Sequence, residues 1–273
     1  MINADDFGLS DDVNLGIISL FESNIISNAS AMVCAKKFEE GLNKLDKKYH
    51  QKLGLHLCLD SDGDPISEIS EIPSLIDKKT GKFYTRKKLV FKILSGQVKK
   101  SELKKEILFQ FNKLTYYGIK PHHFDGHGHI HVIPQIASIL SDLAKKEGIK
   151  YVRKPIEYNL KYQLFRFNRR FILSAIIALF SYISFKKFYK GLNTSHAFFG
   201  LLNSGKINIS FLKSFYNLIK GFPSCSVELM CHPGFKTKKS LYDRWDYNWQ
   251  TEYQALMEIV PNIRSHKNIL LST

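Results

Sequence analysis

Short apolar segments alternate with amphipathic segments along this chain, and this alternation restricts its possible folds more than any other feature. In the segment 53–59 (LGLHLCL), leucines occupy one face of a strand, and Gly54, His56 and Cys58 occupy the other. Because strands that alternate with helices form parallel sheets, the sequence predicts an α/β fold whose sheet is open or closed into a barrel. Helices are predicted at 10–23, 101–117 and 135–147, and further strands at 25–35, 120–133, 151–155 and 226–230.

The length and composition fit a single domain over residues 1–273, with a basic and apolar insertion at about 160–225. The formal net charge of +15 favours contact with an anionic partner, although lysine pairs such as Lys36-Lys37 are also typical of solvated faces. No nucleic-acid-binding motif accompanies the charge, so no nucleic acid is expected as a partner. The oligomeric state stays open.

The uncharged run 171–185 lies between Arg169-Arg170 and Lys186-Lys187. It is shorter than the roughly 20 residues that a spanning helix needs, so it is either a buried core helix or a segment in the membrane interface. The second alternative predicts peripheral membrane contact through 166–190. The four cysteines form no CxxC pair, and no secretory signal opens the chain. These features predict a cytoplasmic protein, with association at the cytoplasmic face of the membrane as the alternative.

Acidic and histidine side chains cluster where predicted strands end, which is where functional residues gather in parallel sheets. If residues 127, 129 and 131 are extended, their imidazoles point to one side. Three histidines and an aspartate within seven residues offer the mixed N/O ligands that suit Zn²⁺ or another divalent ion. The alternative is a histidine-rich loop that binds metal only adventitiously. The long polar loop at 60–83 is also of a length typical of functional loops. The clusters are Asp5-Asp6, His56, the run 125–131 (DGHGHIH) and the run 231–234 (CHPG).

Four motifs together resemble the YdjC/ChbG-like carbohydrate deacetylases. They are NADDFG (3–8), GLHL (54–57), HFDGHGHIH (123–131) and ELMCHPG (228–234). The resemblance covers residues 2 to about 160 and 226–260, and the segment between has no specific counterpart. It implies a deformed, TIM-like (β/α) barrel related to the polysaccharide deacetylases, with one divalent metal ion, Mg²⁺ or Zn²⁺. Gly126 departs from the family, which often has serine there, and the first strand is shorter than expected.

The resemblance also implies roles for individual residues. Asp6, His56 and His127 would be the metal ligands, Asp5 the catalytic base and His232 the acid. His129 and His131 would belong to the second layer of the site or to the substrate floor. Asp125 could orient a histidine, and Glu228 is expected to support His232. Arg153 either binds substrate or pairs with Glu157. An aromatic and basic cluster either stacks on a sugar or packs in the core; it consists of Tyr242, Arg244, Trp245 and Trp249.

The predicted reaction is metal-assisted hydrolysis of an N-acetyl group from an amino sugar. The substrate would be an N-acetylglucosamine-type oligosaccharide or a lipid-linked sugar. One alternative is phosphoester hydrolysis, which would normally need a second metal and more carboxylates. Another is a non-catalytic protein that binds a membrane surface or an anionic ligand and uses a closed metal site structurally.

Overall fold

The computed structural model describes residues 1–158, 169–221, 225–236 and 245–264. Its main sheet has seven strands in the order β7-β6-β3-β2-β1-β9-β8, and all the pairs are parallel. A small antiparallel pair, β4 (Ile76–Asp77) and β5 (Lys82–Phe83), lies in the polar loop. The strands of the main sheet are β1 (Ile2–Phe7), β2 (Asn28–Ala31), β3 (Leu53–Leu57), β6 (His123–Gly126), β7 (Tyr151–Val152), β8 (Ala197–Phe199) and β9 (Val227–Cys231).

The sheet curls until its two edge strands approach each other. Isolated bridges join Tyr151 to Asn193 and Glu157 to Phe198, beside the edge strands β7 and β8. The backbone N–H of Tyr158 donates to the Phe198 carbonyl at 2.9 Å. These contacts link the edges into an incomplete barrel, which agrees with the predicted deformed barrel.

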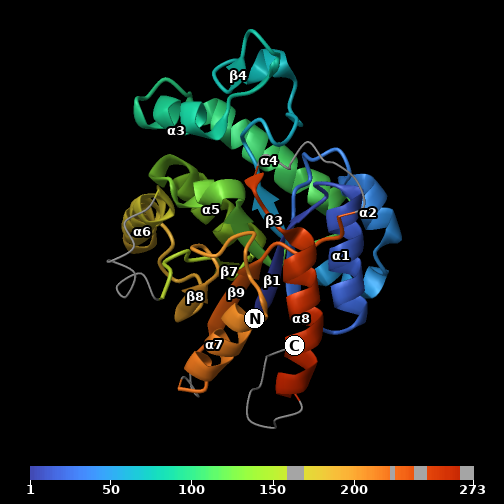
Figure 1. Cartoon of the computed structure of the whole chain (residues 1–273). Helices are drawn as coiled ribbons and strands as arrows, with labels where there is room; N and C mark the ends of the chain where they lie inside the picture. Colours follow the sequence, from blue (N-terminus) through green and yellow to red (C-terminus); the bar gives the residue numbers. More distant parts are fainter. Residues whose placement is uncertain (159–168, 222–224, 237–244, 265–273) are drawn as a thin grey trace.

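Helices surround this barrel (Figure 1). The predicted helices are confirmed as α1 (Asp11–Glu22), α4 (Lys100–Tyr116) and α5 (Pro134–Glu147). As expected, Ser10 caps α1 by accepting a hydrogen bond from the Val13 N–H at 3.2 Å. Strand β8 and four helices were not predicted; the helices are α2 (Phe38–Lys44), α3 (Arg86–Leu94), α7 (Ile209–Ile219) and α8 (Trp249–Arg264).

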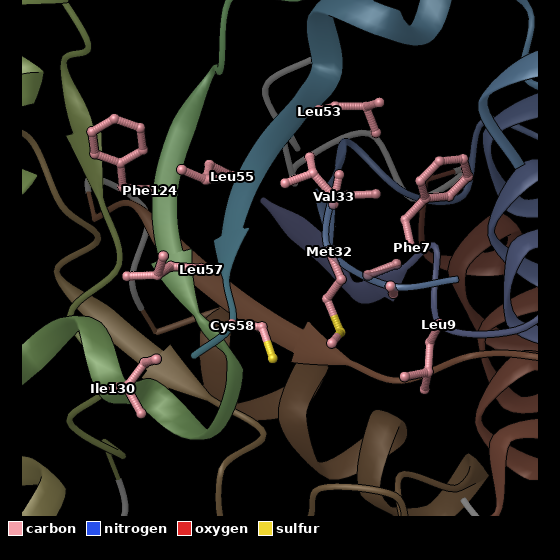
Figure 2. Close-up of a cluster of buried hydrophobic side chains, with 14 of the residues drawn as sticks. Phe7, Leu9, Met32, Val33, Leu53, Leu55, Leu57, Cys58, Phe124 and Ile130 are labelled. Atoms are coloured by element: carbon pink, nitrogen blue, oxygen red, sulfur yellow. The ribbon is translucent and has the colours of Figure 1, made fainter. Parts of the chain in front are cut away.

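The alternating pattern of 53–59 separates the core from the site. Leu55 and Leu57 lie in a cluster of buried apolar side chains that includes Phe124 (Figure 2). His56, on the opposite face of β3, is also buried but contacts polar side chains. One face of the sheet therefore forms the apolar core, and the other presents polar side chains to the interior of the barrel.

The predicted strand at 120–133 is wrong beyond Gly126. Strand β6 ends there, and His127–Val132 form a 3-10 turn, η3. Within it Gly128 and His129 have φ values of 59° and 61°, in the left-handed region. Such a turn breaks the two-residue alternation of a strand, so the three imidazoles do not all converge on one side. His127 contacts Asp6, whereas the rings of His129 and His131 contact each other with centroids 6.2 Å apart.

The apolar run 171–185 lies in helix α6 (Arg169–Lys187), which packs beside α5 (Figure 1). It is not a buried core helix, because several of its large apolar side chains are exposed. Among the described residues, none of the helices is both long enough and apolar enough to cross a membrane.

Candidate metal centre

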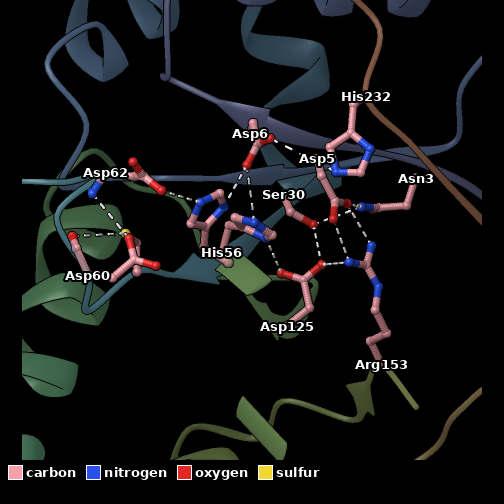
Figure 3. Close-up of polar contacts among 12 residues, drawn as sticks. Asn3, Asp5, Asp6, Ser30, His56, Asp60, Asp62, Asp125, Arg153 and His232 are labelled. Atoms are coloured by element: carbon pink, nitrogen blue, oxygen red, sulfur yellow. Dashed lines mark hydrogen bonds and ion pairs between the residues drawn. The ribbon is translucent and has the colours of Figure 1, made fainter. Parts of the chain in front are cut away.

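Three buried side chains from three elements meet at one point inside the barrel (Figure 3). Asp6 comes from β1, His56 from β3 and His127 from the start of η3. The Asp6 Oδ1 atom lies 3.3 Å from His56 Nε2 and 3.1 Å from His127 Nδ1. The residues implied as metal ligands are thus brought together.

A bulge in β1 allows both adjacent aspartates to serve the site. The register between β1 and β2 shifts between Ala4 and Phe7, and Asp6 has a φ of 72°. In a regular strand, Asp5 and Asp6 would point to opposite faces. The bulge and the left-handed backbone instead direct both carboxylates toward polar partners in the interior (Figure 3).

The donor set fits a divalent cation. Ligand atoms bound at about 2.1 Å are about 3.0 Å apart in an octahedral site and about 3.4 Å apart in a tetrahedral one, close to the distances around Asp6 Oδ1. The buried Asp6 Oδ2 has no hydrogen-bond partner among the described residues. An unpartnered carboxylate oxygen at this position is readily explained by a ligand that completes its coordination.

Each candidate histidine ligand is oriented by a second carboxylate. His56 Nδ1 lies 2.8 Å from Asp125 Oδ1, and His127 Nε2 lies 3.2 Å from Asp62 Oδ2. Such pairing fixes the tautomer and ring angle of a metal-binding imidazole. Asp125 therefore lies where the sequence analysis expected an orienting carboxylate.

Two other groups of three residues have metal-compatible spacing, but arginines already neutralise them. In the group of Asp5, His56 and Asp125, both aspartates form ion pairs with Arg153. In the group of Asp60, Asp62 and His127, both aspartates form ion pairs with Arg86. Among the described lysines and arginines, by contrast, none forms an ion pair with Asp6. The group around Asp6 is therefore the best candidate for a cation.

Buried carboxylates and histidines shift one another's pKa values at the centre. Although burial alone would raise the pKa of the Asp6 carboxyl, the charges and hydrogen bonds of His127 and His56 hold it well below its ordinary value. Burial lowers the pKa of His56, but Asp125 and Asp6 outweigh this and raise it to about 10. The carboxylates that stabilise a proton on His56 would equally stabilise a divalent cation in its place, and binding of the cation would release that proton.

Arg153 lies behind the centre and is completely buried. Its guanidinium donates to both oxygens of Asp5 at 2.6 and 2.7 Å, and it lies 2.8 Å from Asp125 and 2.6 Å from Glu228. The expectation that it pairs with Glu157 is wrong, because Glu157 accepts backbone hydrogen bonds, including one from Leu201 at 2.8 Å. Arg153 therefore holds the Asp5 carboxylate in place.

Glu228 does not support His232 as expected. It lies on β9, where Arg153 and the Tyr151 hydroxyl both donate to it, the latter at 2.7 Å. Glu252 on α8 takes the expected role, since it accepts a hydrogen bond from the His232 backbone N–H at 2.6 Å. In a continued strand residues 228 and 232 would share one face, but β9 ends at Cys231, so the alternation does not extend to His232.

His232 faces the centre from the loop after β9 (Figure 3). Its Nε2 lies 4.0 Å from Asp6 Oδ2, and its Nδ1 has no hydrogen-bond partner among the described residues. Burial lowers the pKa of the imidazole. The loop packs closely on α1 at Gly16, which has no Cβ. A Cβ at this position would lie only 2.5 Å from Gly234 Cα and would prevent the contact. His232 is therefore held beside the candidate ligands without being one of them.

The other predicted site residues lie at varying distances from the centre. His131 is buried, with its Nε2 3.0 Å from the Arg153 carbonyl, and His129 packs edge-on against Phe198. Trp245 lies over His127 with ring centroids 5.1 Å apart, whereas Trp249 is buried. Tyr242 and Arg244 lie outside the described residues.

Several residues of the site were not singled out from the sequence. They are Asn3, Ser30, Asp60, Asp62, Arg86 and Glu252. The length of the loop at 60–83 was a signal for Asp60 and Asp62, but it did not identify them individually.

A family model described as "YdjC-like protein" matches residues 1–259. The chain belongs to this family. A carbohydrate deacetylase from Danio rerio is 35% identical over 163 residues, which are 59% of this chain and 51% of that protein. One from Clostridium beijerinckii is 27% identical over 253 residues, 88% of this chain and 83% of that protein. A chitooligosaccharide deacetylase from Serratia marcescens is 31% identical over 153 residues, 55% of this chain and 56% of that protein. The chain thus spans only about half of two of these relatives.

A protein from Enterococcus faecalis V583 with a known crystal structure has the same fold as this chain. That protein is described as a "putative cellobiose-phosphate cleavage protein". It superposes with a TM-score of 0.77 at 20% identity, covering 100% of this chain and 96% of that one. At this identity, the likeness supports the barrel architecture alone.

Proposed function

We propose that this YdjC-like protein is a metal-dependent hydrolase that removes an N-acetyl group from an amino sugar. The observation that carries the proposal is the meeting of Asp6, His56 and His127 beside Asp5 and His232. Three candidate protein ligands leave coordination positions free for water and substrate, as in catalytic rather than structural sites. The names of the deacetylase relatives support the same reaction class.

In this proposal Asp6, His56 and His127 hold one divalent cation. The cation would lower the pKa of a water molecule and polarise the acetyl carbonyl. Asp5 would accept the proton of the attacking water, with Arg153 fixing the orientation of its carboxylate. His232 would then donate a proton to the departing amine, which must be protonated to leave.

The substrate in this proposal is an N-acetylglucosamine-type oligosaccharide or a membrane-presented amino sugar. Trp245 is half-buried beside His127, and Tyr247 packs on His232 with ring centroids 4.8 Å apart. Aromatic rings beside a polar centre provide a surface on which the apolar face of a pyranose can stack.

The two alternative functions have weaker support. Phosphoester hydrolysis commonly uses a second metal about 3.5–4 Å from the first, and the neighbouring carboxylates are instead paired with Arg86 and Arg153. A purely structural metal would favour four protein ligands. His232, the fourth side chain at the centre, lies 4.0 Å from Asp6 Oδ2 and is better placed for proton transfer.

The decisive experiment measures acetate release from N-acetylglucosamine oligomers and from lipid-linked N-acetyl sugars. It uses chelator-treated protein before and after addition of Mg²⁺, Zn²⁺ or Co²⁺. We expect activity to return with metal. Asp6→Asn should lose both metal binding and activity. Asp5→Asn should retain metal but lower kcat by about a hundredfold or more. Asp11→Asn, on the outer helix α1, is the matched control and should behave as the wild type. Metal-loaded protein that releases no acetate from soluble or lipid-linked N-acetyl sugars would refute the proposal.

A further inference from the structure

Helix α6 exposes most of its large apolar side chains, and its buried face is partly polar. A surface helix ordinarily buries its apolar face and exposes its polar one. On α6 the side chains of Ser174, Ser181 and Ser184 are at most 2% exposed. The large apolar side chains of the opposite face, which we term the α6 stripe, are between 37% and 60% exposed. The α6 stripe consists of Ile172, Leu173, Ile176, Leu179, Tyr182 and Ile183.

The α6 stripe is a concentrated patch rather than a chance scatter. Six of the 14 exposed large apolar side chains among the described residues belong to this one helix. Isolated exposed apolar residues are normal on protein surfaces, but a contiguous row of them marks an interaction surface. No described helix could span a bilayer, so the stripe suits contact along a surface rather than insertion across it.

The sequence segment that contains the stripe is strongly basic, and this indicates what the stripe binds. The segment 158–227 contains ten of the 40 lysines and arginines and none of the 25 aspartates and glutamates. It therefore carries +10 of the net charge of +15 in about a quarter of the chain. Lys186, Lys187 and Lys190 are exposed where the stripe ends. Apolar side chains beside lysines, with no acidic residue among them, match an acyl boundary beneath anionic headgroups.

The inner face of α6 is bonded directly to the turn that carries His127. The Ser184 hydroxyl donates to the Val132 carbonyl at 2.8 Å. Tyr189, just after the helix, donates its hydroxyl to the His131 carbonyl at 2.7 Å. Ile177 packs with Val132 in a small apolar cluster. Helix α6 alone would thus separate a surface in contact with the α6 stripe from η3, the turn that carries His127.

We propose that the α6 stripe docks this protein on the surface of an anionic lipid bilayer. The apolar side chains enter the acyl boundary, and the lysines at the end of the stripe contact lipid phosphates. That the substrate is an amino sugar presented at this surface rests on the proposed function, whereas the docking itself does not.

Sedimentation with vesicles tests the proposal. We expect the full chain to co-sediment with vesicles of phosphatidylglycerol and phosphatidylethanolamine, and less with phosphatidylcholine vesicles. Combining Leu173→Ser, Ile176→Ser and Leu179→Ser should weaken this binding more than about tenfold, since each change removes apolar surface from the bilayer. Combining Lys186→Gln, Lys187→Gln and Lys190→Gln should remove the preference for anionic lipid.

A matched control changes three exposed apolar residues on other helices, with Phe91→Ser, Leu94→Ser and Tyr116→Ser combined. It should bind vesicles as the wild type does. Equal binding by the stripe variant and the wild type, or no binding by the wild type, would overturn the proposal. A wild-type dimer that the stripe variant converts to a monomer would assign the stripe to a second copy instead. Asp6→Asn should bind vesicles normally, which separates docking from catalysis.

Discussion

At the scale of single residues, the centre depends on carboxylates that are not among its three candidate ligands, Asp6, His56 and His127. Asp62 lies against His127 Nε2 and is held in turn by Arg86 at 3.2 Å. Asp125 makes the corresponding contact with His56 Nδ1. An imidazole can rotate about its side-chain bonds. One ring nitrogen is therefore oriented toward a metal only when a hydrogen bond fixes the other ring nitrogen.

Asp62→Ala should therefore weaken metal binding without removing a ligand. We expect the dissociation constant to rise about 10- to 100-fold, because His127 loses the partner that fixes its ring. Isothermal titration calorimetry with Zn²⁺ measures the change. Asp64→Ala in the same loop is the control, since Asp64 is half-exposed and pairs with Lys82. Equal affinities in the two variants would show that Asp62 does not position His127.

At the scale of elements, the turn η3 determines where the histidines point. Gly128, at a φ of 59°, lies against Arg86, whose Nε would be 2.4 Å from a Cβ at this position. The chain leaves β6, reverses through this turn, and enters α5 at Pro134. The position of His127 relative to Asp6 thus depends on a backbone conformation that favours glycine.

Gly128→Ala should disturb both the turn and the metal centre. The left-handed backbone alone costs an alanine roughly 1–2 kcal/mol, and displacement of Arg86 adds to that cost. Urea unfolding and metal titration measure the two effects. Gly96→Ala is a matched control, because Gly96 has a φ of 73° and nothing within 4 Å of the added Cβ. If both variants lose the same stability and bind metal equally, contact with Arg86 is unimportant.

The sequence predicted elements with a regular period better than those set by backbone turns. The alternation in 53–59 located β3 and the face of His56, and the motifs identified Asp6 and His127. The strand prediction failed after Gly126, where two left-handed residues replace the alternation. Asp62 and Arg86 could not be paired with His127 in advance. These contacts join residues from separate loops and helices, and no local sequence pattern predicts contacts of this kind.

At the scale of the whole molecule, buried titratable groups make stability depend on pH in two opposing ways. Burial lowers the pKa of His131 to about 4, from an ordinary value of 6.5. The folded chain therefore binds this proton more weakly than the unfolded chain does, and stability falls as pH drops from 6.5 toward 4. Burial raises the pKa of Glu157 from 4.5 to about 7. Here the folded chain binds the proton more tightly, so stability falls as pH rises from 4.5 through 7.

Two variants of the metal-free protein should separate these contributions. His131→Asn should lessen the loss of stability on acidification, since one buried histidine contributes up to about 3 kcal/mol by pH 4. Glu157→Gln should change the slope in the opposite direction, making stability rise more steeply between pH 4.5 and 7. Urea unfolding at several pH values in the presence of a chelator measures both slopes. Parallel pH profiles for the two variants would mean that neither buried group titrates as the fold implies. Opposite changes would show that the barrel holds His131 neutral and Glu157 protonated below neutral pH, independently of any metal.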